Sequence, residues 1–102
     1  MADSAAAPAT FAQSSAVVGA EIAGETILMN MDTAVYLEID PVGARIWALL
    51  EQPRTFKALV EALMAEFDVD ETVCAANTDA FLSYLAAQGF VAERQAHKGS
   101  RQ

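Results

Sequence analysis

The fold is decided by residues 34–50, AVYLEIDPVGARIWALL, where a strand changes abruptly into a helix. Val35, Leu37 and Ile39 fall at every second position, which is the period of a strand with one buried face. Asp40 can cap the following helix with its carboxylate, and the proline after it suits the first helical position, where the missing N–H costs nothing. We expect this strand to lie at a sheet edge, with backbone groups free to meet a partner.

Two further strands are predicted before this stretch, at Val17–Ile22 and Thr26–Met31. The second of them alternates, with Ile27, Met29 and Met31 on one face. A short polar turn would join it to the next strand as a hairpin. The amino-terminal third is therefore predicted to form an antiparallel sheet of two or three strands.

Three amphipathic helices are predicted after the sheet. Asp40, Thr55 and Asp70 are their expected N-caps, because a short polar side chain accepts hydrogen bonds from the free N–H groups of a first helical turn. The third helix should run to about Gln88, and Gly89 suits the residue that ends it. The residues expected to face inward are Val42, Ile46, Leu49, Leu50, Phe56, Leu59, Val60, Leu63, Met64, Phe67, Val73, Thr78, Phe81, Leu82 and Leu85, with Trp47 beside them. The predicted fold class is α+β, a small antiparallel sheet followed by three helices in a winged-helix-like arrangement.

The length of 102 residues indicates a single domain. Residues 1–16 and 93–102 are mostly small or polar, so we expect both segments to be disordered tails. Residues 17–92 then form the folded domain, which is near the lower size limit for one unassisted core. A domain this small has little room for an enclosed active site, so a surface-binding role is favoured.

The formal net charge of −8 counts against two classes of partner. A nucleic-acid binder needs clustered Lys and Arg to neutralise phosphates, and an anionic membrane surface would repel this chain. No apolar run approaches the ~20 residues needed to span a bilayer, and the N-terminus lacks the basic and apolar parts of a signal peptide. We therefore expect a cytoplasmic protein.

Residues suited to catalysis or metal binding are few. Cys74 is the single cysteine, which rules out an intramolecular disulfide, and we interpret it as a buried apolar residue. His97 is the single histidine and lies in the predicted C-terminal tail, so a zinc site has too few ligands. Helix capping explains the acidic group Asp68, Asp70 and Glu71 without a metal. The sequence predicts no enzymatic activity, no metal and no cofactor.

Tyr36, Asn77 and Tyr84 are candidates for a binding surface. If Val35 and Leu37 face the core, Tyr36 faces away from it. Asn77 and Tyr84 are seven residues apart and lie on one face of the third helix. A groove between this helix and the strand would offer hydrogen-bonding side chains to a peptide. The alternative is that these residues only border the core, and the sequence leaves both interpretations open.

The ordered pattern from about Ile27 to Val91 resembles the PqqD-like family. The shared features are a hydrophobic hairpin, a tyrosine-containing strand, a GARIW-type helix, a Pro-Arg-Thr turn, a leucine-rich helix and a closing FL..L...GFV pattern. They are carried here by Tyr36, Ile39, Asp40, Gly43–Trp47, Pro53–Thr55, Leu59, Leu63, Phe81, Leu82, Leu85 and Gly89–Val91. No single motif is diagnostic, but their order is specific.

The resemblance implies a RiPP recognition element, which is a non-catalytic protein of ribosomal peptide modification pathways. Such a protein binds the leader segment of a precursor peptide as an added strand. It then presents the peptide to a modifying enzyme, such as a radical-SAM enzyme or a leader protease. The peptide-binding positions implied here are Ala34, Val35, Tyr36, Leu37, Glu38, Val73, Asn77, Phe81 and Tyr84.

The sequence departs from the family pattern in two places. Ala34 stands where a glycine usually follows the hairpin turn, which indicates a different turn. The proline-rich opening of members from the coenzyme PQQ pathway is absent, which favours another peptide pathway, such as that of lasso peptides.

Two other classes of function remain open from the sequence. One is a docking or stabilising subunit that binds a larger enzyme without binding a free peptide. The other is a winged-helix transcription regulator, whose recognition helix would be Glu71–Gln88. That helix contains no Lys or Arg, which counts strongly against duplex DNA. The exposed edge strand could also pair with itself and give a homodimer.

Overall fold

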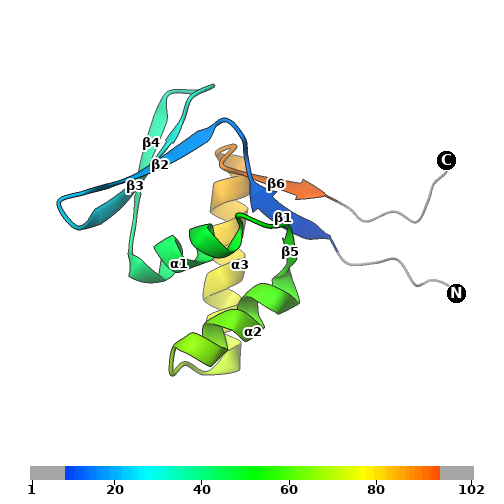
Figure 1. Cartoon of the computed structure of the whole chain (residues 1–102). Coiled ribbons are helices and arrows are strands. Elements are labelled where there is room, and N and C mark those ends of the chain that lie inside the picture. Colours follow the sequence, from blue (N-terminus) through cyan, green and yellow to red (C-terminus); the bar gives the residue numbers. More distant parts are fainter. Residues whose placement is uncertain (1–8, 95–102) are drawn as a thin grey trace, which may run out of the picture.

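The computed structural model of the protein describes residues 9–94. Within this range the chain forms strands and three helices, and the predicted α+β class is confirmed (Figure 1). The elements in chain order are β1 (Thr10–Gln13), β2 (Val17–Ile22), β3 (Glu25–Asn30), β4 (Val35–Ile39), α1 (Pro41–Leu49), β5 (Arg54–Thr55), α2 (Phe56–Glu66), α3 (Glu71–Ala87) and β6 (Val91–Arg94).

The strands form two antiparallel sheets, with the orders β2-β3-β4 and β5-β1-β6. Figure 1 shows the β2-β3-β4 sheet projecting from the helices. The β5-β1-β6 sheet lies at the ends of the described chain, where β1 and β6 run side by side. In the first sheet Leu28 pairs with Gly19 of β2 and with Leu37 of β4. Leu28 is fully buried, so this inner face of the sheet is the one that packs on the helices.

The turn into β4 places Ala34 at φ +61°, in the left-handed region. Glycine occupies this region without steric cost, whereas an alanine pays about 1 kcal/mol because its Cβ crowds the backbone. The chain therefore keeps a conformation that favours glycine while using alanine.

The three predicted N-caps are confirmed. Asp40 Oδ1 accepts a hydrogen bond from the Gly43 N–H at 2.7 Å, and Thr55 Oγ1 accepts one from the Ala58 N–H at 3.0 Å. Asp70 accepts hydrogen bonds from two N–H groups in the first turn of α3. Each cap satisfies donors that have no partner within their own helix.

The end of α3 also follows the prediction. Gly89 has a φ of +79°, and its N–H donates to the Ala86 carbonyl at 3.1 Å. The Phe90 N–H donates to the Leu85 carbonyl at 2.8 Å, which completes a Schellman motif. The motif turns the chain back on itself and places the Phe90 ring in the core, where it is fully buried.

One core joins the helices, the inner sheet face and the chain after α3. Its buried apolar residues are Leu28, Ile39, Ile46, Trp47, Leu49, Leu50, Leu59, Val60, Leu63, Cys74, Leu82, Leu85, Phe90 and Val91. The assignments of Trp47 and Cys74 to the core are confirmed. Burial of such side chains supplies about 1.5–3 kcal/mol each and is the main source of stability.

The prediction of disordered tails is wrong where the structure describes them. β1 lies within residues 1–16 and pairs with both β5 and β6, while β6 extends to Arg94. The predicted domain of residues 17–92 is therefore too short at both ends. The remaining tail residues, which include His97, lie outside the described part of the chain.

β1 escaped the sequence analysis because partners distant in the sequence hold it in place. The Gln13 N–H donates to the Leu50 carbonyl and the Ser14 N–H to the Phe90 carbonyl, both at 3.0 Å. The Gln13 side chain also donates to the carbonyl of Trp47 at 2.7 Å. Phe11 is the only large apolar group of the strand and packs partly on the core. A strand fixed mainly by backbone pairing leaves no alternation in its sequence.

Three residues predicted to face inward are exposed instead. Val42 is 43% exposed, Val73 is 53% exposed and Met64 is 37% exposed. All three lie on the predicted helical stripes, but each stripe is wider than the surface that the neighbouring elements cover.

Asn30 is the polar side chain that connects the hairpin to the helices. Its amide nitrogen donates to the Gly89 carbonyl at 3.0 Å. Its Oδ1 accepts hydrogen bonds from the backbone N–H groups of Asp32 at 2.9 Å and Thr33 at 3.3 Å. Asn30 itself is 2% exposed, so its amide depends on these partners within the protein.

Replacing Asn30 with alanine should lower the free energy of unfolding by about 1–3 kcal/mol, because the hydrogen bonds that link the hairpin to the end of α3 are lost. Urea unfolding followed by the fluorescence of the single tryptophan, Trp47, measures the change. Ser83→Ala is a control on the exposed side of α3 and should change stability by less than about 0.5 kcal/mol. Equal stability of the two variants would contradict this role of Asn30.

Candidate binding groove

β4 lies at the edge of its sheet, as predicted for the strand that begins the opening stretch. In the order β2-β3-β4, no other described strand pairs with its outer side. Along an edge strand of an antiparallel sheet, half of the N–H and C=O groups point away from the neighbouring strand. These groups are available for pairing with an added strand.

The sheet and the start of α1 approach α3 at two points. At one end, Asn30 is the register partner of Val35 and donates to the Gly89 carbonyl just beyond α3. At the other end, the first turn of α1 meets the middle of α3, since a methyl group added to Gly43 would lie 3.0 Å from Phe81 Cζ. The free edge of β4 thus leads toward the start of α1 and the middle of α3, and we call this region the groove.

The groove opens into a pocket of about 490 Å³ where β4 passes into α1. The pocket lies between the start of α1, the end of α2 and the first half of α3. It is lined by Asp40, Val42, Gly43, Ile46, Leu63, Phe67, Val69, Val73, Cys74, Asn77, Thr78 and Phe81. Most of these side chains are apolar, so the pocket suits an apolar group of a ligand.

Two of the three misassigned core residues line this pocket. Val42 extends from the first turn of α1 and Val73 from the first turn of α3. The sequence analysis missed Val42 as a site residue because an apolar stripe does not distinguish a packed wall from an open one. The sequence did contain a signal for this site: the predicted helices carry more apolar residues than one small core can bury.

The predicted site residues of α3 fall into two groups. Val73, Asn77 and Phe81 line the pocket, as the helical spacing of four residues implies. Tyr84 lies one turn further along, is 47% exposed and does not line the pocket. It shares a face of α3 with Asn77, seven residues earlier.

The predicted site residues of β4 divide between the two faces of the sheet. Val35 and Leu37 are half-buried and share the inner face with Leu28. Tyr36 and Glu38 lie on the outer face, and Tyr36 is 66% exposed. The structure therefore does not bring Tyr36 into the pocket with Asn77. Ala34 precedes the strand, in the exposed turn.

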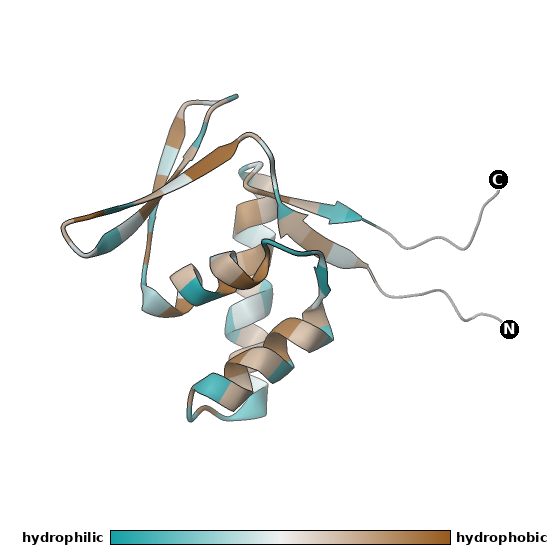
Figure 2. Ribbon diagram, viewed as in Figure 1, coloured by the Kyte–Doolittle hydropathy of each residue, from teal (hydrophilic) through white to brown (hydrophobic). Residues whose placement is uncertain are grey.

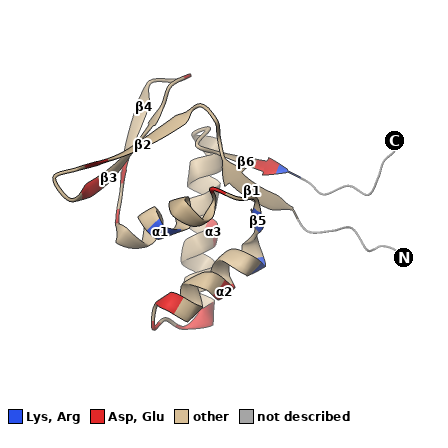
Figure 3. Cartoon of the chain, in the orientation of Figure 1, with Lys and Arg blue, Asp and Glu red and all other residues tan. Residues whose placement is uncertain are grey.

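Two carboxyl groups near the groove, those of Glu38 and Glu66, have shifted pKa values. A side-chain hydrogen bond with Glu25, together with repulsion between the two charges, raises the pKa of the Glu38 carboxyl. Glu66 of α2 accepts a hydrogen bond from Arg45 of α1 at 2.7 Å, and this contact lowers the pKa of the Glu66 carboxyl. Figure 3 shows that α3 has no basic residue along its length and that acidic residues cluster near the α2–α3 connection.

The described residues contain no group of three or more His, Cys, Asp or Glu side chains that could hold a metal ion. None of the described helices is long and apolar enough to cross a membrane. Cys74 is buried at the pocket wall, 4.0 Å from Thr78 Oγ1.

A comparison with protein-family models identifies the family of this chain. Residues 25–91 match the model of coenzyme PQQ synthesis protein D (PqqD). The matched residues span β3, β4, all three helices and the start of β6. The chain belongs to the PqqD family. The resemblance predicted from the order of the motifs is thus confirmed, and both walls of the groove lie inside the PqqD match. A search of curated proteins finds no match.

Two solved structures are similar to this member of the PqqD family. TbiB1 in complex with the TbiA(beta) leader peptide is 36% identical, with a TM-score of 0.71 over 78% of this chain and 93% of that chain. A lasso peptide synthetase B1 complexed with the leader peptide has a TM-score of 0.70 over 80% of this chain and 96% of that chain. The second structure is 17% identical and supports the fold alone.

The single cysteine offers a direct measurement of the pocket wall. Because Cys74 is 6% exposed, its thiol should react with a disulfide reagent about 100-fold more slowly in the native protein than in denaturant. Absorbance of the released thiolate follows the rate, and the denatured chain is the internal control. A native rate equal to the denatured rate would show that this wall of the pocket is open to solvent.

Proposed function

We propose that this protein is a non-catalytic adaptor that captures the leader segment of a ribosomally made precursor peptide and delivers it to a modifying enzyme. The leader adds a strand to the free edge of β4, and α3 forms the opposite wall of its groove. An apolar leader side chain enters the pocket between α1 and α3.

The observation that carries the proposal is a strand edge with no partner strand among the described residues, leading through the start of α1 to an apolar pocket. An added strand obtains register from the backbone of β4 and selectivity from pockets for its side chains. The valines Val42 and Val73 are exposed in the free protein, where they gain nothing from burial in the core. A ligand that covers them would supply that burial.

The energies require both parts of the groove. About four backbone hydrogen bonds at ~0.5–1.5 kcal/mol each supply roughly 2–6 kcal/mol. Micromolar affinity needs ~8 kcal/mol, and ordering a flexible leader costs ~2–5 kcal/mol more. Two or three apolar side chains at ~1.5–3 kcal/mol each make up the difference. Pairing with β4 alone is therefore too weak, and the pocket is needed.

The similar structures support a leader peptide as the ligand. TbiB1 is more than one-third identical to this chain and is in complex with the TbiA(beta) leader peptide. A lasso-type pathway also agrees with the missing proline-rich opening of the coenzyme PQQ members. The enzyme that receives the peptide would be a leader protease or another modifying enzyme.

Binding to duplex DNA is disfavoured by the charge of α3. In a winged-helix regulator this helix would enter the major groove, where phosphates require basic side chains nearby. α3 carries Glu71 and Asp79 and has no Lys or Arg. Repulsion from the phosphates would oppose docking in that orientation.

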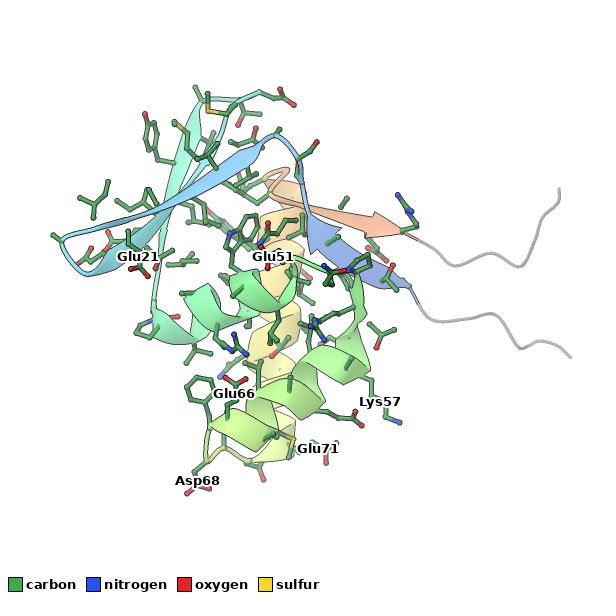
Figure 4. All side chains as sticks on the ribbon, in the orientation of Figure 1. Glu21, Glu51, Lys57, Glu66, Asp68 and Glu71 are labelled. Carbon is green, nitrogen blue, oxygen red and sulfur yellow. The ribbon has the colours of Figure 1, made fainter. Side chains whose placement is uncertain are left out.

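Two substitutions on the groove side of α3 should weaken binding of the leader peptide encoded beside this chain. Val73→Asp places a charge at the apolar pocket and Tyr84→Ala removes apolar area, so each should raise Kd by about tenfold or more. Fluorescence anisotropy of a labelled leader measures Kd, and backbone-amide NMR shifts should cluster on Ala34–Glu38 and Asn77–Tyr84. Lys57→Ala is the control, since Figure 4 shows Lys57 on α2, well away from the β2-β3-β4 sheet.

The proposal fails if both groove variants bind the leader with the affinity of the wild-type chain. It also fails if the NMR shifts caused by the leader lie outside these two segments. Unfolding curves of each variant separate a loss of binding from a loss of fold, because both substituted side chains are exposed.

A further inference from the structure

The outer face of the β2-β3-β4 sheet has no covering element among the described residues. Strand alternation places Val18, Ala20 and Ile22 of β2, Ile27 and Met29 of β3 and Tyr36 of β4 on this face. We call these six residues the outer apolar face. Its central row runs straight across the sheet, because Met29 pairs with Val18 on one side and with Tyr36 on the other.

The outer apolar face is well exposed. Val18 is 53% exposed and Ile22 is 58% exposed, in addition to Tyr36. Figure 2 shows hydrophobic segments in this sheet where it stands away from the helices. Isolated apolar residues on a surface are ordinary, whereas a contiguous apolar patch marks an interaction site.

An acidic pair borders the outer apolar face toward the β2–β3 turn. Glu25 pairs with Ile22, and Glu38 pairs with Ile27, so both carboxylates lie on the outer side of the sheet. Their mutual hydrogen bond raises the pKa of the Glu38 carboxyl, as expected for two like charges held close together. A cation from a partner would relieve this repulsion.

We infer that the outer apolar face is the docking surface for the enzyme that acts on the bound peptide. The enzyme would present apolar side chains to the central row and an Arg or Lys to Glu25 and Glu38. This inference rests on the proposed function, because it takes the peptide to lie along β4.

The position of β4 favours this occupant. β4 supplies Tyr36 to the outer apolar face and Glu38 to the acidic pair at its border, and its free edge is where the peptide strand would be added. Side chains of that added strand would continue the same face beyond Tyr36. An enzyme seated there would contact adaptor and peptide together and would distinguish the loaded adaptor from the empty one.

Charge complementarity also favours a basic partner over a second copy of this chain. Each chain carries a net charge of −8, so two copies repel each other electrostatically. A partner with cations over the acidic pair gains attraction from the same charges. Its affinity should therefore fall as the salt concentration rises.

The test uses the full chain, its leader peptide and the purified modifying enzyme encoded beside it. The double variant Val18→Gln/Ile22→Gln should weaken binding of the enzyme by about tenfold, since it removes two exposed apolar side chains of the face. Glu25→Lys should weaken it several-fold and reduce its dependence on salt. Affinity for the leader should stay within about twofold in both variants. Biolayer interferometry measures the enzyme, and fluorescence anisotropy measures the leader.

Matched controls lie on α2. Met64→Gln removes an exposed apolar residue, and Glu61→Lys reverses an exposed charge, both away from the sheet. Enzyme binding by these controls should equal that of the wild-type chain. Unfolding curves check the fold, and Glu25→Lys keeps the test valid if the double variant is unstable.

Three outcomes would overturn the inference. One is that the double variant and Glu25→Lys both bind the enzyme with the affinity of the wild-type chain, or that the peptide-loaded wild-type chain does not bind the enzyme at all. Another is a sedimentation dimer that the double variant abolishes, which would make the occupant a second copy. The third is loss of leader affinity together with enzyme affinity in a folded variant, which would mean that the face belongs to the peptide site. Failure of the proposed function is seen separately, as absence of leader binding by the wild-type chain.

Discussion

The arrangement of this protein depends on the hydrogen bonds of one buried amide, that of Asn30. It donates to the carbonyl of Gly89 beyond α3 and accepts from the turn that leads into β4. Asn30 ends β3 and pairs with Val35 of β4, so this side chain links the hairpin that carries β4 to the chain just after α3.

The pocket is a consequence of the small size of the domain. Three short helices and a three-stranded sheet cannot cover every apolar position on their own stripes. The uncovered positions, Val42 and Val73, meet at the starts of α1 and α3, where N-caps fix both helix ends. Binding of a ligand thus uses apolar surface that folding left exposed.

The β2-β3-β4 sheet divides its tasks between its two faces and its edge. The inner face, with Leu28 and Ile39, is buried in the core. Within residues 9–94, no strand pairs with the outer edge of β4 and no element covers the outer apolar face. A single strand, β4, contributes to all three surfaces. The proposed peptide site and the proposed enzyme-docking surface are therefore connected through β4. The same geometry explains why Tyr36 and Asn77 do not meet: they belong to different surfaces.

The sequence by itself determined the local elements, because their signals lie within a few residues: the caps Asp40, Thr55 and Asp70, the glycine turn after α3 and the alternation of β3 and β4. The order of these elements also revealed the family. Only the tertiary structure decided that β1 exists, since its hydrogen bonds come from residues far along the chain. It also decided that Val42 and Val73 line a pocket and that Tyr36 stands on the outer face. Burial depends on what lies opposite a side chain, and a one-dimensional pattern fixes a residue's face but not its neighbour.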